Sequence, residues 1–416
     1  MAPLAAWLAR QEKSHPNSID LGLARVREVA RRLDLLTPSH RVITVGGTNG
    51  KGSTVAFLDG LLRAAGMRVG RFTSPHLTRY NERICIDDVE ARDDDLIASF
   101  QRIDAARGDI TLTFFEYNAL AALDLFARAR VDLAVLEVGL GGRLDATNII
   151  DADVAVVTSI GIDHVDWLGH TVEEIGREKA GIFRTGRPAV LGSADMPRSV
   201  FEAIGAIGAQ AVVAGRDFRA EIHDARWNFE CGDLHLRDLP LPALAGRQQP
   251  ANAAAALAAL VYAGFATTLT APRVDRVLRE TRIRGRFQVV PGDVEWVLDV
   301  AHNVPAAESL RDNLATLPPR RTLAVCGVLG DKDIAGITRA LAPAIDAWVL
   351  AGLEGPRAVS PAELASRLPD GAVTLGEEKD VAAACRRARD TAVRGERIVV
   401  FGSFLTVGPA LEFLGI

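Results

Sequence analysis

Apolar and polar positions alternate along the first half of the chain as they do in α/β sheets. Four apolar runs predict buried strands, at residues 41–47, 68–76, 131–142 and 151–164. Residues 52–66 and 113–130 instead place apolar side chains at helical spacing, and we expect the first of these helices to end near Gly66. Buried strands that alternate with helices predict a parallel sheet covered by helices on both faces. Nucleotides bind such sheets at the carboxyl ends of the strands.

The pattern changes in the second half of the chain. Residues 216–241 predict antiparallel hairpin strands, and residues 250–265 predict a long alanine-rich helix. A second series of strands and helices then begins. Its strands are expected at residues 294–303, 321–330, 344–353 and 396–404.

The length suggests two or three domains. The chain has 416 residues, of which 48% are hydrophobic and 24% charged, so a sizeable core can be buried. We place a hinge between about Arg284 and Gly292, where the second series begins. We therefore expect a larger α/β domain over residues 1–285 and a smaller, Rossmann-like α/β domain over residues 286–416.

Charge and cysteine usage narrow the class of protein. The net charge is −5 and there is no long basic run, which argues against nucleic acid as the main partner. The four cysteines (Cys85, Cys231, Cys326 and Cys385) have no metal-ligand spacing and predict reduced thiols in the cytoplasm. Arg10 precedes any long apolar segment, so we expect no signal peptide. We also expect no membrane span, for lack of about 18 uncharged apolar residues in a row.

A glycine-rich segment, GGTNGKGS, lies between the first predicted strand and its helix. Backbone N–H groups of such a loop can approach phosphate oxygens, and the helix N-terminus adds positive potential. Lys51 can reach the β and γ phosphates of a nucleotide, and the hydroxyl of Ser53 can bind magnesium. In the usual phosphate-binding loop the Ser or Thr follows Gly-Lys directly, whereas Gly52 is inserted here. An ordinary glycine-rich turn is the alternative, but the placement of lysine and serine argues against it.

Other polar side chains follow the predicted strands and helices. Glu137 ends a buried strand, where it can supply an oxygen ligand to magnesium or, equally well, form a structural ion pair. Asp163 and His164 follow the next strand, where a lone histidine is more often a structural hydrogen-bonding group. Lys179, taken alone, is a lysine on a helix surface. The GLGG segment does not complete a dinucleotide fingerprint because position 144 is leucine, so a dehydrogenase is disfavoured.

Five motifs occur together and in order: GGTNGKGS, EVGLGGRLDATN, DHVDWLG, REKAGIF and DVAHN. With them the sequence resembles the folylpolyglutamate synthase family from about Trp7 to Val407, and especially its bifunctional bacterial members. Each motif is modest alone, and the set is highly specific. Gly-Lys-Gly-Ser/Thr is that family's form of the phosphate loop, which accounts for Gly52, whereas the related Mur ligases lack this glycine. The resemblance implies that the larger domain is P-loop NTPase-like and Mur-ligase-like.

The resemblance also implies a reaction, that of an ATP- and Mg²⁺-dependent amide ligase. ATP would phosphorylate the carboxylate of dihydropteroate, or the terminal glutamate carboxylate of a folate. The amine of L-glutamate would then displace the phosphate, giving dihydrofolate or a folylpolyglutamate. Clustered anions of this kind need Mg²⁺ and lysine to suppress their repulsion. Two Mg²⁺ sites are implied, K⁺ is a further candidate cation, and we expect a cytoplasmic monomer that binds neither nucleic acid nor membrane.

Site residues follow from the motifs that they match. The residues implied to bind ATP are Thr48, Asn49, Gly50, Lys51, Gly52, Ser53, Asn252, Arg286 and Asp299. The residues implied to bind the metal ions are Ser53, Ser74, Glu137, His164 and Lys179. The residues implied to be catalytic are Lys51, Lys179, His302 and Ser403. Ser74 and Glu137 would bind one ion and His164 the other, while Lys179 resembles the family's carbamylated lysine, whose carbamate can bind metal.

Two segments resemble the dihydropteroate-binding segments of bifunctional members, SIDLGLARV (Ser18–Val26) and LTFFEY (Leu112–Tyr117). The residues implied to bind substrate are Ile19, Asp20, Leu21, Arg83, Thr113, Phe114, Phe115 and Glu116. The two acidic side chains can accept hydrogen bonds from pterin N–H groups, and either phenylalanine can pack on the pterin ring. Both phenylalanines are explained equally well as helix core. The arginine is a candidate to bind an anionic group of the substrate.

Three alternative functions make different demands on the sequence. A monofunctional folylpolyglutamate synthase would lack the dihydropteroate reaction. A Mur-type amino-acid ligase would need an additional N-terminal UDP-sugar domain, and the strand at Val42 begins too early for one. A nucleotide-driven switch would recognise guanine through an Asn-Lys-x-Asp motif, and the sequence contains none.

Overall fold

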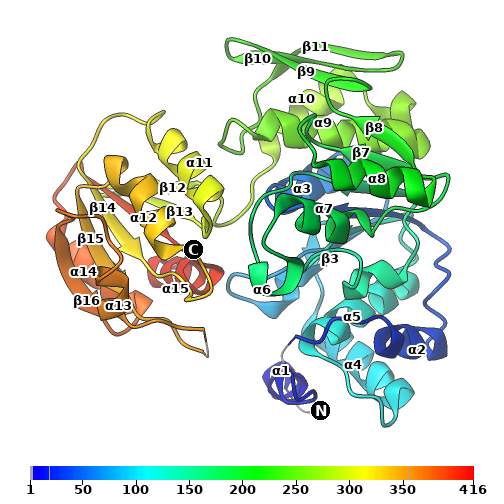
Figure 1. Cartoon of the computed structure of the whole chain (residues 1–416), viewed down its shortest axis with the longest axis horizontal. Coiled ribbons are helices and arrows are strands. Elements are labelled where there is room, and N and C mark those ends of the chain that lie inside the picture. Colours follow the sequence, from blue (N-terminus) through cyan, green and yellow to red (C-terminus); the bar gives the residue numbers. More distant parts are fainter. Residues whose placement is uncertain (1–2, 18, 356) are drawn as a thin grey trace. The chain divides into compact units, whose positions relative to one another are not determined.

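The computed structural model describes residues 3–17, 19–355 and 357–416. Ser18, part of one predicted pterin segment, lies outside the described residues. The chain forms two compact units, both visible in Figure 1. The larger unit consists of Met1–His76, Tyr80–Ala243 and Gln248–Thr281. The smaller unit consists of Leu77–Arg79, Leu244–Arg247 and Arg282–Ile416.

The larger unit is built on an eight-stranded sheet in the order β4-β3-β2-β5-β1-β6-β7-β8. Six strands run parallel: β2 (Val69–Phe72), β5 (Leu133–Glu137), β1 (Arg41–Gly46), β6 (Val154–Val157), β7 (Pro188–Leu191) and β8 (Gln210–Val213). The other two, β3 (Ile84–Ile86) and β4 (Val89–Glu90), pair antiparallel at one edge. The four predicted strands are confirmed, although β2 ends before the SPH segment. Strands β3, β4, β7 and β8 were not predicted, and β3 and β4 are too short to form an apolar run.

Helices cover both faces of this sheet (Figure 1). One face carries α3 (Lys51–Ala64) and α9 (Gln249–Leu260), with α10 (Ala271–Glu280) packed against α3. The opposite face carries α2 (Ala24–Arg32), α4 (Asp93–Arg107), α5 (Phe114–Ala129), α7 (Val172–Ala180) and α8 (Arg198–Ile207). The N-terminal helix α1 (Leu4–Glu12) packs on α4 and α5. Helices on both faces of a largely parallel sheet confirm the predicted fold class.

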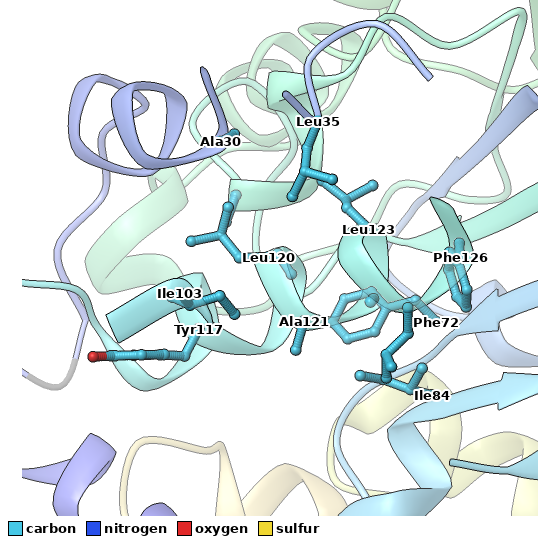
Figure 2. Close-up of a cluster of buried hydrophobic side chains, with 14 of the residues drawn as sticks. Ala30, Leu35, Phe72, Ile84, Ile103, Tyr117, Leu120, Ala121, Leu123 and Phe126 are labelled. Carbon is cyan, nitrogen blue, oxygen red and sulfur yellow. The ribbon is translucent and has the colours of Figure 1, made fainter. Parts of the chain in front are cut away.

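Figure 2 shows part of the core between this sheet and helices α2, α4 and α5. Leu120 of α5 and Phe72 of β2 are fully buried there. Burying a side chain of this size stabilises the fold by about 1.5–3 kcal/mol. Tyr117 is also buried, and its hydroxyl donates to Asp104 Oδ1 at 3.2 Å, which satisfies the phenol. The start of α5 is therefore anchored by packing on one side and by hydrogen bonds on the other.

The predicted hairpin segment forms a separate three-stranded antiparallel sheet. Its strands are β9 (Phe218–His223), β10 (Arg226–Cys231) and β11 (Leu234–Pro240). The helical segment Gln249–Thr268, which includes α9, is long and apolar enough by composition to cross a membrane, although we expected no such segment. Residues 253–260 are at most 1% exposed, so this segment is the core helix of its unit.

The smaller unit has a six-stranded sheet in the order β12-β13-β17-β14-β15-β16. Its strands are β12 (Gln288–Val290), β13 (Glu295–Asp299), β17 (Arg397–Phe401), β14 (Thr322–Cys326), β15 (Ala347–Ala351) and β16 (Thr374–Glu378). Only β12 pairs antiparallel. One face carries α11 (Val304–Leu314), α12 (Ile334–Leu341) and α13 (Pro361–Ala365), and the other carries α14 (Val381–Thr391) and α15 (Phe404–Leu414). The four strands predicted here are confirmed, whereas β12 and β16 were not predicted.

Candidate active site

Three neighbouring strands of the larger sheet end at one edge. Val45 of β1 pairs with Glu137 of β5, and Gly46 pairs with Val157 of β6. The phosphate loop after β1, the carboxylate at the end of β5 and the loop after β6 therefore emerge side by side. This is the edge at which parallel α/β sheets bind nucleotides.

The phosphate loop enters α3 through Gly50, which has a left-handed backbone with φ of 88°. A Cβ atom at Gly50 would lie 2.5 Å from Asn252 Oδ1, so this glycine also allows α9 to approach the loop. Lys51 is the first residue of the helix, which places Gly52 and Ser53 in its first turn. Here the backbone N–H groups have no intrahelical acceptor and are available to an anion. The structure thus brings Asn252 to the predicted triphosphate-binding residues.

The residues after β6 hold the loop in place. The Thr48 N–H donates to Ser159 O at 2.8 Å, and the Asn49 N–H donates to Ser159 Oγ at 3.1 Å. Thr158 Oγ1 donates to Asn49 O at 2.7 Å. Thr48 Oγ1 in turn donates to Gly161 O at 3.1 Å. These bonds fix the loop before any ligand arrives, which reduces the ordering cost of binding.

Two lysine side chains converge on the carbonyl oxygen of Gly47. Lys51 Nζ and Lys179 Nζ each donate to it at 3.0 Å. Lys179 is 5% exposed, and burial, with a further contribution from the charge of Lys51, lowers its pKa to about 7. Two ammonium groups on one acceptor make this edge of the sheet a strong anion site. Lys179 is thus a buried residue rather than the surface lysine that its sequence context alone suggests.

Glu137 is buried beside the phosphate loop. Its Oε2 accepts from the Ser74 N–H at 3.2 Å, and a Cβ atom at Gly52 would lie 3.9 Å from its Oε1. The glycine after Lys51 thus leaves room next to this carboxylate. A carboxylate and the hydroxyls of Ser53 and Ser74 are the oxygen donors that Mg²⁺ prefers. Within the described residues, no three His, Cys, Asp or Glu side chains are grouped to hold a metal ion, so a site here would depend on hydroxyl and phosphate oxygens.

His164 occupies the N-cap position of the short helix α6 (Val165–Leu168) with a left-handed backbone, φ of 52°. The backbone N–H of His164 donates to Asp163 Oδ1 at 2.8 Å. A left-handed conformation is uncommon for a residue with a side chain and is concentrated at functional sites. The conformation of His164 is therefore compatible with the predicted metal ligand, and its contact with a metal stays a prediction.

The two predicted pterin segments meet through an arginine that the sequence did not indicate. Arg25 Nη1 donates to Asp20 Oδ2 at 2.8 Å, and Arg25 Nη2 lies 3.3 Å from Glu116 Oε1. Glu116 Oε2 accepts from the Thr113 N–H at 2.7 Å, and Thr113 Oγ1 accepts from the Glu116 N–H, forming a capping box. Both oxygens of Glu116 thus have protein partners, whereas Asp20 is one-third exposed.

The two phenylalanines of this segment have different surroundings. A Cβ atom at Gly139 would lie 2.4 Å from Phe115 Cζ, so the Phe115 ring packs directly on the backbone of the GLGG loop. Phe114 instead lies under Arg83, whose guanidinium carbon is 5.5 Å from the ring centroid. Both rings also border the core of Figure 2. Each ring is partly buried against the core and partly accessible to a ligand.

Arg83 is buried without a carboxylate partner in the part of the chain that the structure describes. Its Nε donates to His76 Nδ1 at 2.8 Å, and its guanidinium also lies over Tyr80. Burial and the charge of Arg83 lower the pKa of His76 to about 4, which keeps this histidine a neutral acceptor at neutral pH. A buried cation of this kind is suited to an anionic ligand.

The predicted residues of the smaller unit lie at the carboxyl ends of two paired strands. Asp299 of β13 pairs with Phe401 of β17, two residues before Ser403. The Phe287 and Ala301 N–H groups donate to the Asp299 carboxylate at 2.7 and 2.8 Å.

The other predicted side chains of this unit surround Phe404. His302 Nδ1 lies 2.8 Å from Val300 O, which fixes the proton on that nitrogen. The Arg286 guanidinium lies over the Phe404 ring, whose centroid is 6.4 Å from that of His302. The structure therefore brings Arg286, Asp299, His302 and Ser403 to one edge of their own sheet.

Comparison with known proteins identifies the family of this chain. Residues 45–260 match the Mur ligase middle domain, and residues 285–404 match the Mur ligase, glutamate ligase domain. The dihydrofolate synthase/folylpolyglutamate synthase of Escherichia coli (strain K12) is 46% identical over 99% of this chain and 96% of that protein. This chain belongs to the dihydrofolate synthase/folylpolyglutamate synthases of the Mur ligase family.

Solved structures agree with this membership. E. coli FolC in complex with DHPP and ADP superimposes with a TM-score of 0.93 at 45% identity, covering 100% of this chain and 98% of that one. A bifunctional folylpolyglutamate synthase/dihydrofolate synthase with Mn, AMPPNP and L-glutamate bound gives a TM-score of 0.91 at 45% identity, covering 100% and 99%. The family and fold that the sequence motifs implied are thus confirmed.

The predicted site residues of this chain lie in both matched domains and in the loop that precedes them. Those from Thr48 to Asn252 lie in the middle domain, and those from Arg286 to Ser403 lie in the glutamate ligase domain. The loop residues Ile19–Leu21 precede both. Sequence reasoning missed Arg25, His76 and Ser159; the Glu116 partner of Arg25 is 91 residues away, and the partners of Ser159 are backbone groups of the phosphate loop. One signal was available, since Arg25 lies inside the quoted segment SIDLGLARV.

Proposed function

We propose that this protein is an ATP- and Mg²⁺-dependent ligase that adds L-glutamate to dihydropteroate and to folates. The observation on which the proposal depends is the convergence of Lys51, Lys179 and Glu137 on the phosphate loop. Membership of the dihydrofolate synthase/folylpolyglutamate synthases supports the substrates. The related structures that contain ADP or AMPPNP support the nucleotide, and the one that contains Mn supports a divalent metal.

The reaction has two steps. An oxygen of the substrate carboxylate attacks the γ-phosphorus of ATP, ADP leaves, and an acyl phosphate forms. The amine of L-glutamate then attacks the acyl carbon, the bond to the phosphate oxygen breaks, and the amine loses a proton. Phosphorylation is needed because a carboxylate is a poor electrophile until it has a good leaving group.

The residues of this chain would mainly neutralise the charge of the phosphates and hold the reacting groups in position. The N–H groups at the start of α3 and the ammonium of Lys51 would bind the phosphates and the charge that develops between them. Ser53, Ser74 and Glu137 would hold one Mg²⁺, which when bound neutralises phosphate charge and polarises the transferred group. His164 would contribute to a second metal site, and K⁺ is a further candidate cation.

Lys179 is proposed to carry a carbamate. The amine is buried, and it shares one carbonyl acceptor with the positively charged Lys51. A carbamate would convert this buried cation into an anion that can pair with Lys51 and bind metal. A pKa of about 7 supports the modification, because CO₂ reacts with the neutral amine.

Arg83 is proposed to receive a carboxylate of the substrate. Its guanidinium lies over Phe114, next to the segment assigned to the pterin end. The hydrogen bond that Nε donates to His76 fixes the guanidinium, and the two Nη groups form a fork that matches a carboxylate.

Each domain is assigned its own set of site residues. Residues 1–285 would hold the triphosphate and the pterin substrate. Residues 286–416 would contribute Arg286 and Asp299 to ATP, and His302 and Ser403 to L-glutamate and the reacting groups. We further propose a cytoplasmic location and a monomeric state.

The test is ADP release by the purified enzyme with ATP, Mg²⁺ and L-glutamate. Release that depends on dihydropteroate, and separately on tetrahydrofolate, is the expected result. Release with tetrahydrofolate alone would identify a monofunctional folylpolyglutamate synthase. Release with neither substrate would refute the proposed function.

A further inference from the structure

The loop between α1 and α2 is fastened to the start of α5 at several points. Ser14 Oγ donates to Leu112 O at 2.6 Å, which joins positions 98 residues apart. Arg25 makes the second link, to Glu116 at a separation of 91 residues. The loop contains Ile19–Leu21, and the start of α5 contains Thr113–Phe115. These links therefore hold together the two segments assigned to the pterin.

Arg25 binds both segments with a single guanidinium. Nη1 donates to Asp20 Oδ2 at 2.8 Å, and Nη2 donates to the backbone carbonyl of Asp20 at 2.9 Å. The same Nη2 lies 3.3 Å from Glu116 Oε1. The guanidinium is planar and rigid, so these contacts fix the direction of the Asp20 backbone as well as the distance between the segments.

The far end of this network is rigid. Glu116 is 3% exposed, and its second oxygen belongs to the capping box of α5. A carboxylate buried to this degree needs a charged or hydrogen-bonding partner, which Arg25 supplies in part. At the near end, His15 Nε2 lies 3.3 Å from Asp20 Oδ2, the same oxygen that accepts from Arg25.

We propose that Arg25 is a positioning residue for the dihydropteroate reaction, which holds loop 19–23 against the start of α5 in the conformation that receives the pterin. This inference depends on the proposed function. Arg25 acts through the Asp20 backbone and through Glu116, and the loop presents its own groups to the pterin. A salt bridge that only stabilises the fold would instead affect both activities in proportion to the stability lost.

The experiment compares Arg25→Lys and Arg25→Gln with Arg27→Lys and Arg27→Gln. Arg27 is on the same helix and exposed, and its side chain has no hydrogen bond or ion pair within the described residues. The KM and kcat for dihydropteroate and for tetrahydrofolate are measured with each enzyme, together with the thermal midpoint of unfolding. Arg25→Lys keeps the charge and loses the planar fork.

For both Arg25 variants we expect the KM for dihydropteroate to rise by roughly 10- to 100-fold, with the KM for tetrahydrofolate changed less than about threefold. Asp20→Asn is expected to give the same division between substrates, and its effect should be less than additive with that of Arg25→Lys. The Arg27 variants should match the wild type. Equal losses with both substrates, or losses that follow the thermal midpoint, would overturn the proposal.

Three further outcomes are informative. If Arg25→Gln does not fold, Arg25→Lys and Asp20→Asn still test the division between the substrates. If neither Arg25 variant folds, Asp20→Asn decides, since equal losses with both substrates would overturn the proposal. A wild-type enzyme without activity on either substrate would refute the proposed function itself, whereas equal losses with both substrates in the variants of an active enzyme would overturn only the role of Arg25.

Discussion

Lys179 donates from its buried Nζ atom to the carbonyl oxygen of Gly47 at 3.0 Å, on the opposite side of the sheet from the helix that begins at Lys51. Lys51 donates to the same carbonyl. One backbone oxygen therefore accepts from two amine side chains, and the charge of Lys51 adds to the effect of burial in lowering the pKa of Lys179. The phosphates of ATP would pair with the charge of Lys51, and a carbamate formed from CO₂ and the neutral amine would replace the charge of Lys179 with an anion.

Lys179→Ala is accordingly expected to lose nearly all turnover, with partial recovery in acetate, because a small carboxylate can occupy the space of the carbamate. The wild-type enzyme should take up label from ¹³C-bicarbonate at Lys179, and more of it as the pH rises through about 7, where the amine becomes neutral. Mass spectrometry of the intact protein and ¹³C NMR measure the label. The exposed Lys379 serves as the control position. An unlabelled Lys179 in a fully active enzyme would disprove the carbamate.

Glu137→Gln is expected to lower kcat by roughly 100- to 1,000-fold for both substrates, because it removes a charge opposite the phosphates. His164→Ala should also abolish turnover if this residue binds the second metal. The amide of Glu137→Gln can still accept from the Ser74 N–H, so the fold should be retained. Steady-state rates over a range of Mg²⁺ concentrations measure the effect. Near-normal kcat at ordinary Mg²⁺ would remove the substituted residue from the metal site.

The site was predictable where its chemistry is local in sequence. The phosphate loop and the carboxylate of Glu137 follow strands that are apolar because both faces are buried, and such runs are visible without a structure. The role of Arg25 was not visible, because its partner Glu116 is 91 residues away. Short strands such as Ile84–Ile86 were missed for a different reason, since three residues show no period.

Glu116 is expected to affect stability, because its oxygens cap α5 and contact Arg25. Glu116→Ala should lower the free energy of unfolding by about 1–3 kcal/mol, whereas Thr113→Ala should cost about 1 kcal/mol through the cap alone. Denaturant unfolding measures both. Glu28→Ala, which removes only the surface ion pairs with Arg31 and Arg32 of α2, is the control and should change little. Wild-type stability of Glu116→Ala would contradict the capping role.

His40 gives a pH dependence of stability. Burial lowers its pKa, with the charge of Asp153 acting in the opposite direction. The unfolded chain therefore binds more protons than the folded one just below the ordinary histidine pKa of about 6.5, so acidification there favours unfolding. His40→Phe keeps a ring of similar size and should lose less stability than the wild type between about pH 7 and 5.5. Urea unfolding at the two pH values compares the free energy of unfolding of the wild type with that of His40→Phe. An identical pH dependence in the two proteins would exclude His40 as the cause of that dependence.

The two activities are expected to share one phosphate site and to differ at the pterin end. Both reactions activate a carboxylate and couple it to the same amine, so Lys51→Ala should remove both together. A folate is longer than dihydropteroate by at least one glutamate, so its pterin must lie elsewhere when its terminal carboxylate reaches the γ-phosphate. Asp20→Ala should therefore raise the KM for dihydropteroate by roughly 10- to 150-fold while folate elongation falls much less. Competition between the two substrates in one assay measures whether the phosphate site is shared, since each should then inhibit turnover of the other. If Asp20→Ala depressed both reactions equally, a separate position for the shorter substrate would be wrong, whatever the result with Lys51→Ala.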